Sequence, residues 1–298
     1  MKHKSIVIIM LVILITITTA CAGNKPLNEL PVIDEPKHEQ SAESSESQES
    51  PELPHEQEHD DENKLTDADN DEAVPEILLP PETDSNGIII AIDPGHQRNG
   101  NYTQERIGPG ASHTKPMVSS GTTGVATKIP EYEFTLEISL QLRDELISRG
   151  YEVFMIRETH DVDISNSTRA EMAAESGASV FIRIHANGSN DSSVNGILTI
   201  SPTSHTPFIP ALYSRSRALS QCVLDGMIET TGAKNRGIWE TDTMTGINWS
   251  KIPVTIVELG FMTNPDEDRL MQTPEYQQKL VEGMANGIDF FFIFEFGD

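Results

Sequence analysis

Histidine and glutamate side chains at the ends of hydrophobic runs are the strongest candidates for chemistry in this sequence. His96 follows the run GIIIAID (87–93) through a Pro-Gly turn, and His185 directly follows FIRI (181–184). Glu258 lies in the run TIVEL (255–259), and Glu131 begins a segment with helical periodicity. Two histidines and a carboxylate, with a fourth position open for water, are typical of a catalytic zinc site. A further carboxylate could serve as the general acid or base.

Each of these residues also has an ordinary structural interpretation. A lone histidine at a strand end is more often a hydrogen-bonded loop residue than a ligand. Glu131 and the nearby Glu133 could simply stabilise the N-terminus of a helix. Glu258 is harder to explain in this way, because a carboxylate among buried strand residues is unfavourable unless it is paired or associated with a metal. The hypothesis of a metal site therefore depends on all the positions together.

The pentapeptide HEQEH (55–59) is a competing zinc motif, since it fits both H-E-x-x-H and H-x-x-E-H. On a helix packed against a core, such a motif places two histidines on one face beside a catalytic glutamate. Residues 51–72 contain almost no large apolar side chains that could hold a helix in this way. We therefore interpret HEQEH as a chance product of an acidic segment.

The elements that must position the candidate residues alternate between strand and helix. Hydrophobic runs predict strands at 87–93, 151–156, 179–184, 196–201 and 253–259. Amphipathic periodicity predicts helices at 131–150, 165–177, 210–231 and 274–294. The alternation predicts a single α/β domain, with a twisted, largely parallel or mixed sheet of about six strands covered by helices on both faces. Such sheets bind ligands beyond the carboxyl ends of their strands, so the candidates are expected to converge there.

The N-terminal part of the chain differs in composition from the rest. Residues 1–21 combine a basic start, an apolar run and Cys21 after a small residue, which resembles a bacterial lipoprotein signal with a lipidated cysteine. Plain secretion and an uncleaved anchor are the alternatives, and all three export the remaining chain. Residues 22–85 hold 20 Asp and Glu against three Lys and show no sustained periodicity, so they are predicted to form a disordered acidic linker. The expected catalytic domain is then 86–298.

Charge, cysteine content and motifs argue against three other classes of protein. A formal net charge of −26 disfavours a nucleic-acid binder, because phosphate contacts require Lys and Arg. With Cys21 and Cys222 as its two cysteines, the chain has no disulfide framework, and its stability must come from a core. A serine hydrolase is disfavoured because the sequence has no G-x-S-x-G motif.

The sequence strongly resembles the zinc-dependent N-acetylmuramoyl-L-alanine amidases of the Amidase_3 type. The resemblance covers nearly all of 86–294, and its four motifs occur in the family's order: IIIAIDPGHQ, IPEYEFTLEISLQLRDELISRGYEVFMIRET, STRAEMAAESGASVFIRIHANGS and IPVTIVELGFMTNP. It implies a peptidoglycan hydrolase that cleaves the amide between N-acetylmuramic acid and the L-alanine of the stem peptide. The implied partners are peptidoglycan and, through Cys21, the outer face of the cytoplasmic membrane, with a monomeric catalytic domain.

The resemblance also implies roles for individual residues. The family's zinc ligands fall on His96, Glu131 and His185, with Glu133 as the alternative to Glu131, and its catalytic glutamate falls on Glu258. In the implied reaction a zinc-activated water attacks the carbonyl, and Glu258 passes the proton of that water to the departing alanine nitrogen. Another zinc-dependent wall peptidase, or a non-catalytic wall-binding lipoprotein, remains an alternative to this function.

Two features depart from the family pattern. Gln97 follows the DPGH histidine where many members have glycine, and the glycine-rich interval 97–130 is longer than in compact members. This interval is expected to rim the cleft and to contact substrate, since it lies between two ligands. Within it, His113 is either a substrate contact or an exposed loop residue. Trp239 and Trp249 are either substrate contacts or ordinary packing residues.

Overall fold

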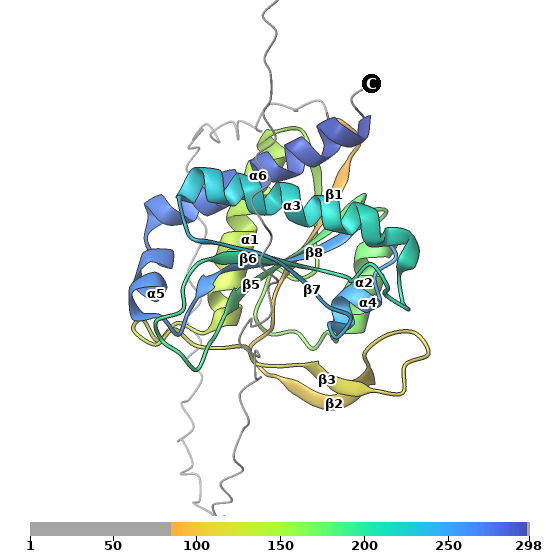
Figure 1. Ribbon diagram of the computed structural model, residues 1–298, viewed down its shortest axis with the longest axis horizontal. Coiled ribbons are helices and arrows are strands. Elements are labelled where there is room, and N and C mark those ends of the chain that lie inside the picture. The colour runs from red at the N-terminus through yellow and green to blue at the C-terminus, as the bar shows by residue number, and fades with distance from the viewer. Residues whose placement is uncertain (1–84, 297–298) are drawn as a thin grey trace, which may run out of the picture. The chain divides into compact units, whose positions relative to one another are not determined.

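A twisted six-stranded sheet forms the centre of the protein, as the computed structural model shows for residues 85–296 (Figure 1). The strands follow the order β4-β1-β5-β8-β6-β7 across the sheet. Their bounds are β1 Ile89–Pro94, β4 Glu152–Met155, β5 Val180–Asn187, β6 Ile197–Ser201, β7 Asn235–Glu240 and β8 Val254–Phe261. The features predicted for 1–84, which include Cys21, HEQEH and nearly all of the acidic linker, lie outside the described residues.

Strand direction in the sheet follows from the length of the connections. Strands β4, β1, β5 and β8 run parallel to one another, whereas β6 runs antiparallel to β8 and parallel to β7. A parallel strand requires a long crossover, usually through a helix. Residues 188–196 connect β5 to β6 without a helix, so β6 returns in the opposite direction. The prediction of a largely parallel, mixed sheet of about six strands is confirmed.

Helices cover both faces of the sheet, as the sequence predicted. Helices α1 (Glu131–Ser148), α3 (Tyr213–Thr231) and α6 (Pro274–Phe296) pack on one face, and α2 (Asn166–Glu175) and α4 (Thr245–Asn248) on the other. Along β1, Ile90 and Ile92 contribute to the first core and Ala91 to the second, because successive strand side chains point to opposite faces. A 3₁₀ turn (Pro210–Leu212) precedes α3, and α5 (Pro265–Met271) follows β8. Within 85–296 no helix is both long and apolar enough to cross a bilayer.

The interval 97–130 contains a β-hairpin that the sequence prediction missed. Strand β2 (Asn101–Arg106) pairs antiparallel with β3 (Thr114–Val118) and forms a separate two-stranded sheet (Figure 1). Most side chains of β2 are exposed, so the strand lacks the apolar alternation that identifies a strand in a sequence. The hairpin is fixed to the domain by polar contacts, such as the 2.5 Å hydrogen bond from the Ser167 hydroxyl to Glu105 Oε2. Strand β7 was also not predicted, because NRGIWE is a polar edge strand with a central glycine.

Candidate metal centre

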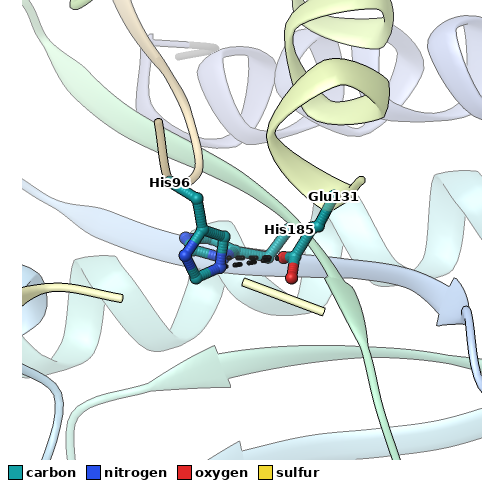
Figure 2. A group of neighbouring side chains, drawn as sticks. All are labelled: His96, Glu131 and His185. Carbon is teal, nitrogen blue, oxygen red and sulfur yellow. Dashed lines mark hydrogen bonds and ion pairs between the residues drawn. The ribbon is translucent and has the colours of Figure 1, made fainter. Parts of the chain in front are cut away.

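Three side chains from distant parts of the chain converge at the carboxyl edge of the sheet. The atoms His96 Nε2, Glu131 Oε1 and His185 Nδ1 lie within 4.8 Å of one another (Figure 2). Nε2 of His96 lies 3.1 Å from both Glu131 Oε1 and His185 Nδ1, and the distance from His185 Nδ1 to Glu131 Oε1 is 3.3 Å. The structure therefore brings together the three residues that the sequence singled out as ligands.

Local backbone geometry places each of these side chains. His96 follows β1 with a φ of 62°, a left-handed conformation that is uncommon for a residue with a side chain. Gly95 before it has no room for a side chain, because a Cβ there would lie 2.5 Å from Cε1 of His185. Glu131 is the first residue of α1, and His185 lies near the carboxyl end of β5. The turn, the helix start and the strand end thus meet at one point.

Hydrogen bonds to neighbouring residues orient two of the three candidate ligands, His96 and Glu131. Nδ1 of His96 lies 3.0 Å from the carbonyl oxygen of Ser119, and a proton on Nδ1 leaves the lone pair of Nε2 free to bind a cation. Glu131 Oε2 accepts a 2.8 Å hydrogen bond from the Thr122 amide, and Oε1 accepts one of 3.0 Å from the Ala186 amide. Such partners fix the ring tautomer and the carboxylate rotamer before any ion binds.

The charges in the cluster favour an ionised carboxylate beside neutral and cationic rings. Burial raises the pKa of Glu131, but the two imidazoles outweigh that effect and hold the pKa well below its usual range. Burial lowers the pKa of His96, yet the Glu131 charge outweighs it, so the pKa is raised. Burial lowers the pKa of His185 to about 4, although its hydrogen bond to Glu131 opposes the change. The ionised Glu131 therefore favours the cationic form of His96, whereas burial keeps His185 neutral.

The donor set fits a zinc ion. Two imidazole nitrogens and one carboxylate oxygen are the protein ligands of one class of catalytic zinc sites, which keep a fourth position open. Here the three donor atoms point toward a common space rather than away from one another (Figure 2). His185 has its other ring nitrogen, Nε2, buried without a hydrogen-bond partner among the described residues. These three residues could together hold a divalent cation.

Glu258 lies beside this cluster on the neighbouring strand. In the sheet it is paired with His185 across β8 and β5, so both side chains belong to the same part of the edge. Its Oε2 is buried, and no residue in 85–296 donates a hydrogen bond to it. Burial, and then repulsion by Glu131, raise the pKa of Glu258 to about 8. A carboxyl group with a pKa near neutrality and a free oxygen is suited to proton transfer.

The other residues considered from the sequence lie outside the cluster. Glu133 is exposed, and its carboxylate accepts a hydrogen bond from the Tyr132 hydroxyl, so Glu131 is the acid that meets the histidines. His113 is exposed. Trp239 packs against the second core, and so does Trp249, whose Nε1 also donates to the carbonyl of Arg106. Both tryptophans thus make ordinary packing contacts.

Gln97, the residue that departs from the family pattern, is buried in polar contacts. Its Oε1 accepts hydrogen bonds of 3.0 Å from the amide of Ile164 and from the guanidinium of Arg169. Its Nε2 donates to the carbonyl of Asn99 at 3.0 Å. The amide thus connects the turn after His96 to the start of α2, a role that glycine could not fill.

Three site residues in the interval 97–130 were missed individually by the sequence prediction. Ser119 and Thr122 hold His96 and Glu131, while Gly121 between them has a φ of 79°. A Cβ on Gly121 would lie 2.8 Å from Glu131 Oε2 and 2.9 Å from the ring of His96. The run SSGTTG (119–124) was the available signal, since small residues allow a backbone to approach a site closely.

This fold and this cluster define residues 85–296 as an α/β domain with a candidate metal centre at the carboxyl edge of its sheet. Residues 90–289 match the family model for N-acetylmuramoyl-L-alanine amidase. The match spans most of the chain, and the chain belongs to this amidase family.

Individual relatives agree with the family assignment. The N-acetylmuramoyl-L-alanine amidase Rv3717 of Mycobacterium tuberculosis is 27% identical over 206 residues, which are 68% of this chain and 85% of the relative. The germination-specific N-acetylmuramoyl-L-alanine amidase of Bacillus subtilis is 26% identical over 219 residues, covering 68% of this chain and 78% of the relative. The crystal structure of the amidase Ami1 from Mycobacterium smegmatis aligns with a TM-score of 0.63 and 26% identity, covering 70% of this chain and 98% of that one.

Proposed function

We propose that the protein is a zinc-dependent peptidoglycan amidase that hydrolyses the bond between N-acetylmuramic acid and the L-alanine of the stem peptide. Membership of the amidase family supports the reaction. The observation that supports the metal is the convergence of His96, Glu131 and His185, whose donor atoms lie within 4.8 Å of one another. The proposed roles are three zinc ligands and one residue that acts first as general base and then as general acid, Glu258.

A bound zinc ion polarises the scissile carbonyl and lowers the pKa of water toward about 7. In the proposed reaction Glu258 accepts the proton of the attacking water and then donates it to the alanine nitrogen, so that the C–N bond breaks into a lactyl carboxylate and a free amine. Glu258 must be ionised to accept that proton. The negative charge of Glu131 is one cause of the raised pKa of Glu258. A cation held by Glu131 would offset that charge and so favour the ionised form of Glu258.

The place of action is the cell envelope. The composition of residues 1–21 supports export and lipid anchoring through Cys21, and the acidic segment 22–85 would then serve as a tether. The catalytic domain is proposed to act as a monomer. The relatives include amidases described as acting in the cell wall, such as the probable cell wall amidase LytH of Staphylococcus aureus. A proposed anchor on the outer face of the cytoplasmic membrane places the enzyme beneath its substrate.

One experiment tests the reaction and its metal together. Purified peptidoglycan is digested with the full chain, with and without a chelator, and the new ends are identified by mass spectrometry. We expect new muramic carboxyl groups and new L-alanine amino ends. The chelator should prevent their formation, and added zinc should restore it. New ends inside the stem peptide would indicate a wall peptidase instead. Binding to peptidoglycan without new ends would indicate a non-catalytic wall-binding protein.

A further inference from the structure

Arg157, which lies just beyond β4, is a buried arginine whose donors are directed at backbone oxygens. Arg157 is only 3% exposed. Nε donates to the carbonyl of Pro94 at 2.9 Å, and Nη2 donates to the carbonyls of Gly95 at 2.9 Å and Tyr132 at 2.8 Å. Pro94 and Gly95 precede His96, while Tyr132 follows Glu131. One guanidinium therefore contacts the two segments that carry two of the candidate ligands.

We propose that Arg157 is a positioning residue of the metal centre, which sets the separation between His96 and Glu131 by joining the turn of one to the helix start of the other. This inference rests on the proposed zinc site. The arginine side chain suits the role because its planar guanidinium presents several donors in fixed directions. Arg157 does not touch the ligand side chains, so it acts through the backbone that carries them.

Thr135 completes the connection from the helix side. Its hydroxyl donates to the same Gly95 carbonyl at 2.8 Å and accepts a hydrogen bond from Arg157 Nη2 at 3.3 Å. Thr135 lies one turn along α1 from Glu131. Arg157 therefore contacts the first turn of α1 at two points, the Tyr132 carbonyl and the Thr135 hydroxyl. The Glu131 carboxylate is thereby fixed relative to the left-handed turn at His96.

A second buried arginine, Arg169, provides an informative contrast. It donates to Asp93 Oδ1 at 2.6 Å, to the Pro94 carbonyl at 3.1 Å and to the His96 carbonyl at 3.0 Å. These contacts fix the turn from the side of α2, and Arg169 has no hydrogen-bond partner on α1 among the described residues. Arg169 therefore supports His96, whereas Arg157 relates His96 to Glu131.

We expect substitution of Arg157 to be compatible with folding. Asp93, the buried carboxylate of this region, keeps its ion pairs with Arg169 and Arg183 when Arg157 is changed. Breaking a buried ion pair is costly when it leaves a buried charge without a partner. Loss of Arg157 leaves Asp93 paired, so this cost does not arise. The Gly95 carbonyl also keeps its hydrogen bond from Thr135. The variant should change the geometry of the site more than the stability of the fold.

The test measures zinc affinity and ligand geometry in full-length Arg157→Met and Arg157→Lys. We expect Arg157→Met to bind zinc about 10–100-fold more weakly in competition with a chromogenic chelator, as for other residues that orient metal ligands. Arg157→Lys should lie between this variant and wild type. The visible spectrum of the cobalt-loaded protein should also shift, because it reports the arrangement of the ligands. If Arg157→Met does not fold, Arg157→Lys is judged by the same two measurements.

The matched control is Arg149→Met, at the C-terminal end of α1. Arg149 bonds to Asp289 at 2.6 Å and to Asn286 at 2.9 Å, so its loss removes contacts between helices far from the ligands. It should lower thermal stability and leave zinc affinity and the cobalt spectrum unchanged. The inference is overturned if a folded Arg157 variant binds zinc like wild type, or if Arg149→Met weakens binding equally. If wild type binds no more zinc than His185→Ala, the proposed metal centre itself fails.

Discussion

His185 and Glu258 lie directly opposite each other on neighbouring parallel strands, β5 and β8. His185 belongs to the candidate metal centre at the end of β5, and Glu258 on β8 presents a carboxyl group with an unpaired buried oxygen. Parallel strands place their carboxyl ends at the same edge of a sheet, so the pairing brings a candidate ligand and a candidate acid-base group together. The division of roles between these two residues leads to the first two predictions.

Glu258→Gln should abolish most turnover and leave zinc binding intact. The substitution keeps the size of the side chain but removes proton transfer, which contributes roughly 10²–10⁴-fold to rate. The measurements are muropeptide release and zinc content per chain. A variant with most of its activity would show that Glu258 is not the proton-transfer residue.

His185→Ala should lose zinc as well as activity, because its Nδ1 is one of three converging donor atoms. His113→Ala is the matched control, since His113 is exposed in the interval 97–130 and is not part of the cluster. Zinc per chain is measured for both after dialysis against metal-free buffer. Equal zinc in the two variants would contradict the proposed ligand set.

Glu258 should make the metal-free protein lose stability as pH rises. Burial and the Glu131 charge raise its pKa to about 8, above the ordinary value of 4.5 that it takes when unfolded. Between these values the folded state keeps a proton that the unfolded state releases, so rising pH favours unfolding. The contribution of protonated Glu258 to the free energy of unfolding is fully present below about pH 4.5 and is lost as pH rises to about 8. Thermal unfolding between pH 5 and 8 should show a weaker pH dependence in Glu258→Gln, and equal slopes would contradict the raised pKa.

Gly121→Ala should weaken zinc binding by about tenfold or more, an effect typical of disturbed second-sphere contacts. The added Cβ would lie 2.8 Å from Glu131 Oε2 and 2.9 Å from the His96 ring, so both ligands must shift. Gly110→Ala is the control, because Gly110 has a similar φ of 76° and no atom within 4 Å of its added Cβ. Both variants should lose about 1–2 kcal/mol from the left-handed backbone, but Gly110→Ala should keep its zinc affinity.

Removal of residues 22–85 should leave hydrolysis of soluble muropeptides unchanged. This segment contains HEQEH, which lacks apolar neighbours to hold it on a core. Among the described residues, the candidate site is built from His96, Glu131 and His185. Rates of the full chain and the shortened chain are compared on the same soluble substrate. Loss of zinc together with activity in the shortened chain would implicate HEQEH in metal binding.

Much of the fold was predictable because buried elements carry strong local patterns. The run GIIIAID predicted β1, and the apolar repeat of 131–150 predicted α1 to within two residues of its observed end. The β2–β3 hairpin and β7 were missed because their side chains face solvent or alternate irregularly. Their stability comes from contacts with other parts of the chain, such as the Asn166 side chain on the Met117 carbonyl, which no local pattern contains.

The sequence by itself predicted five strands of the central sheet, the helices α1, α2, α3 and α6, and the side chains that could serve a zinc site, because residue type and periodicity are local properties. Tertiary structure decided which acid meets the histidines: Glu131 is buried against them, while Glu133, two residues along α1, is exposed. It also placed Ser119 and Thr122 in hydrogen-bonding contact with His96 and Glu131, and Arg157 against the backbone beside them. Those contacts join segments far apart in the chain, and only folding sets the distances between them.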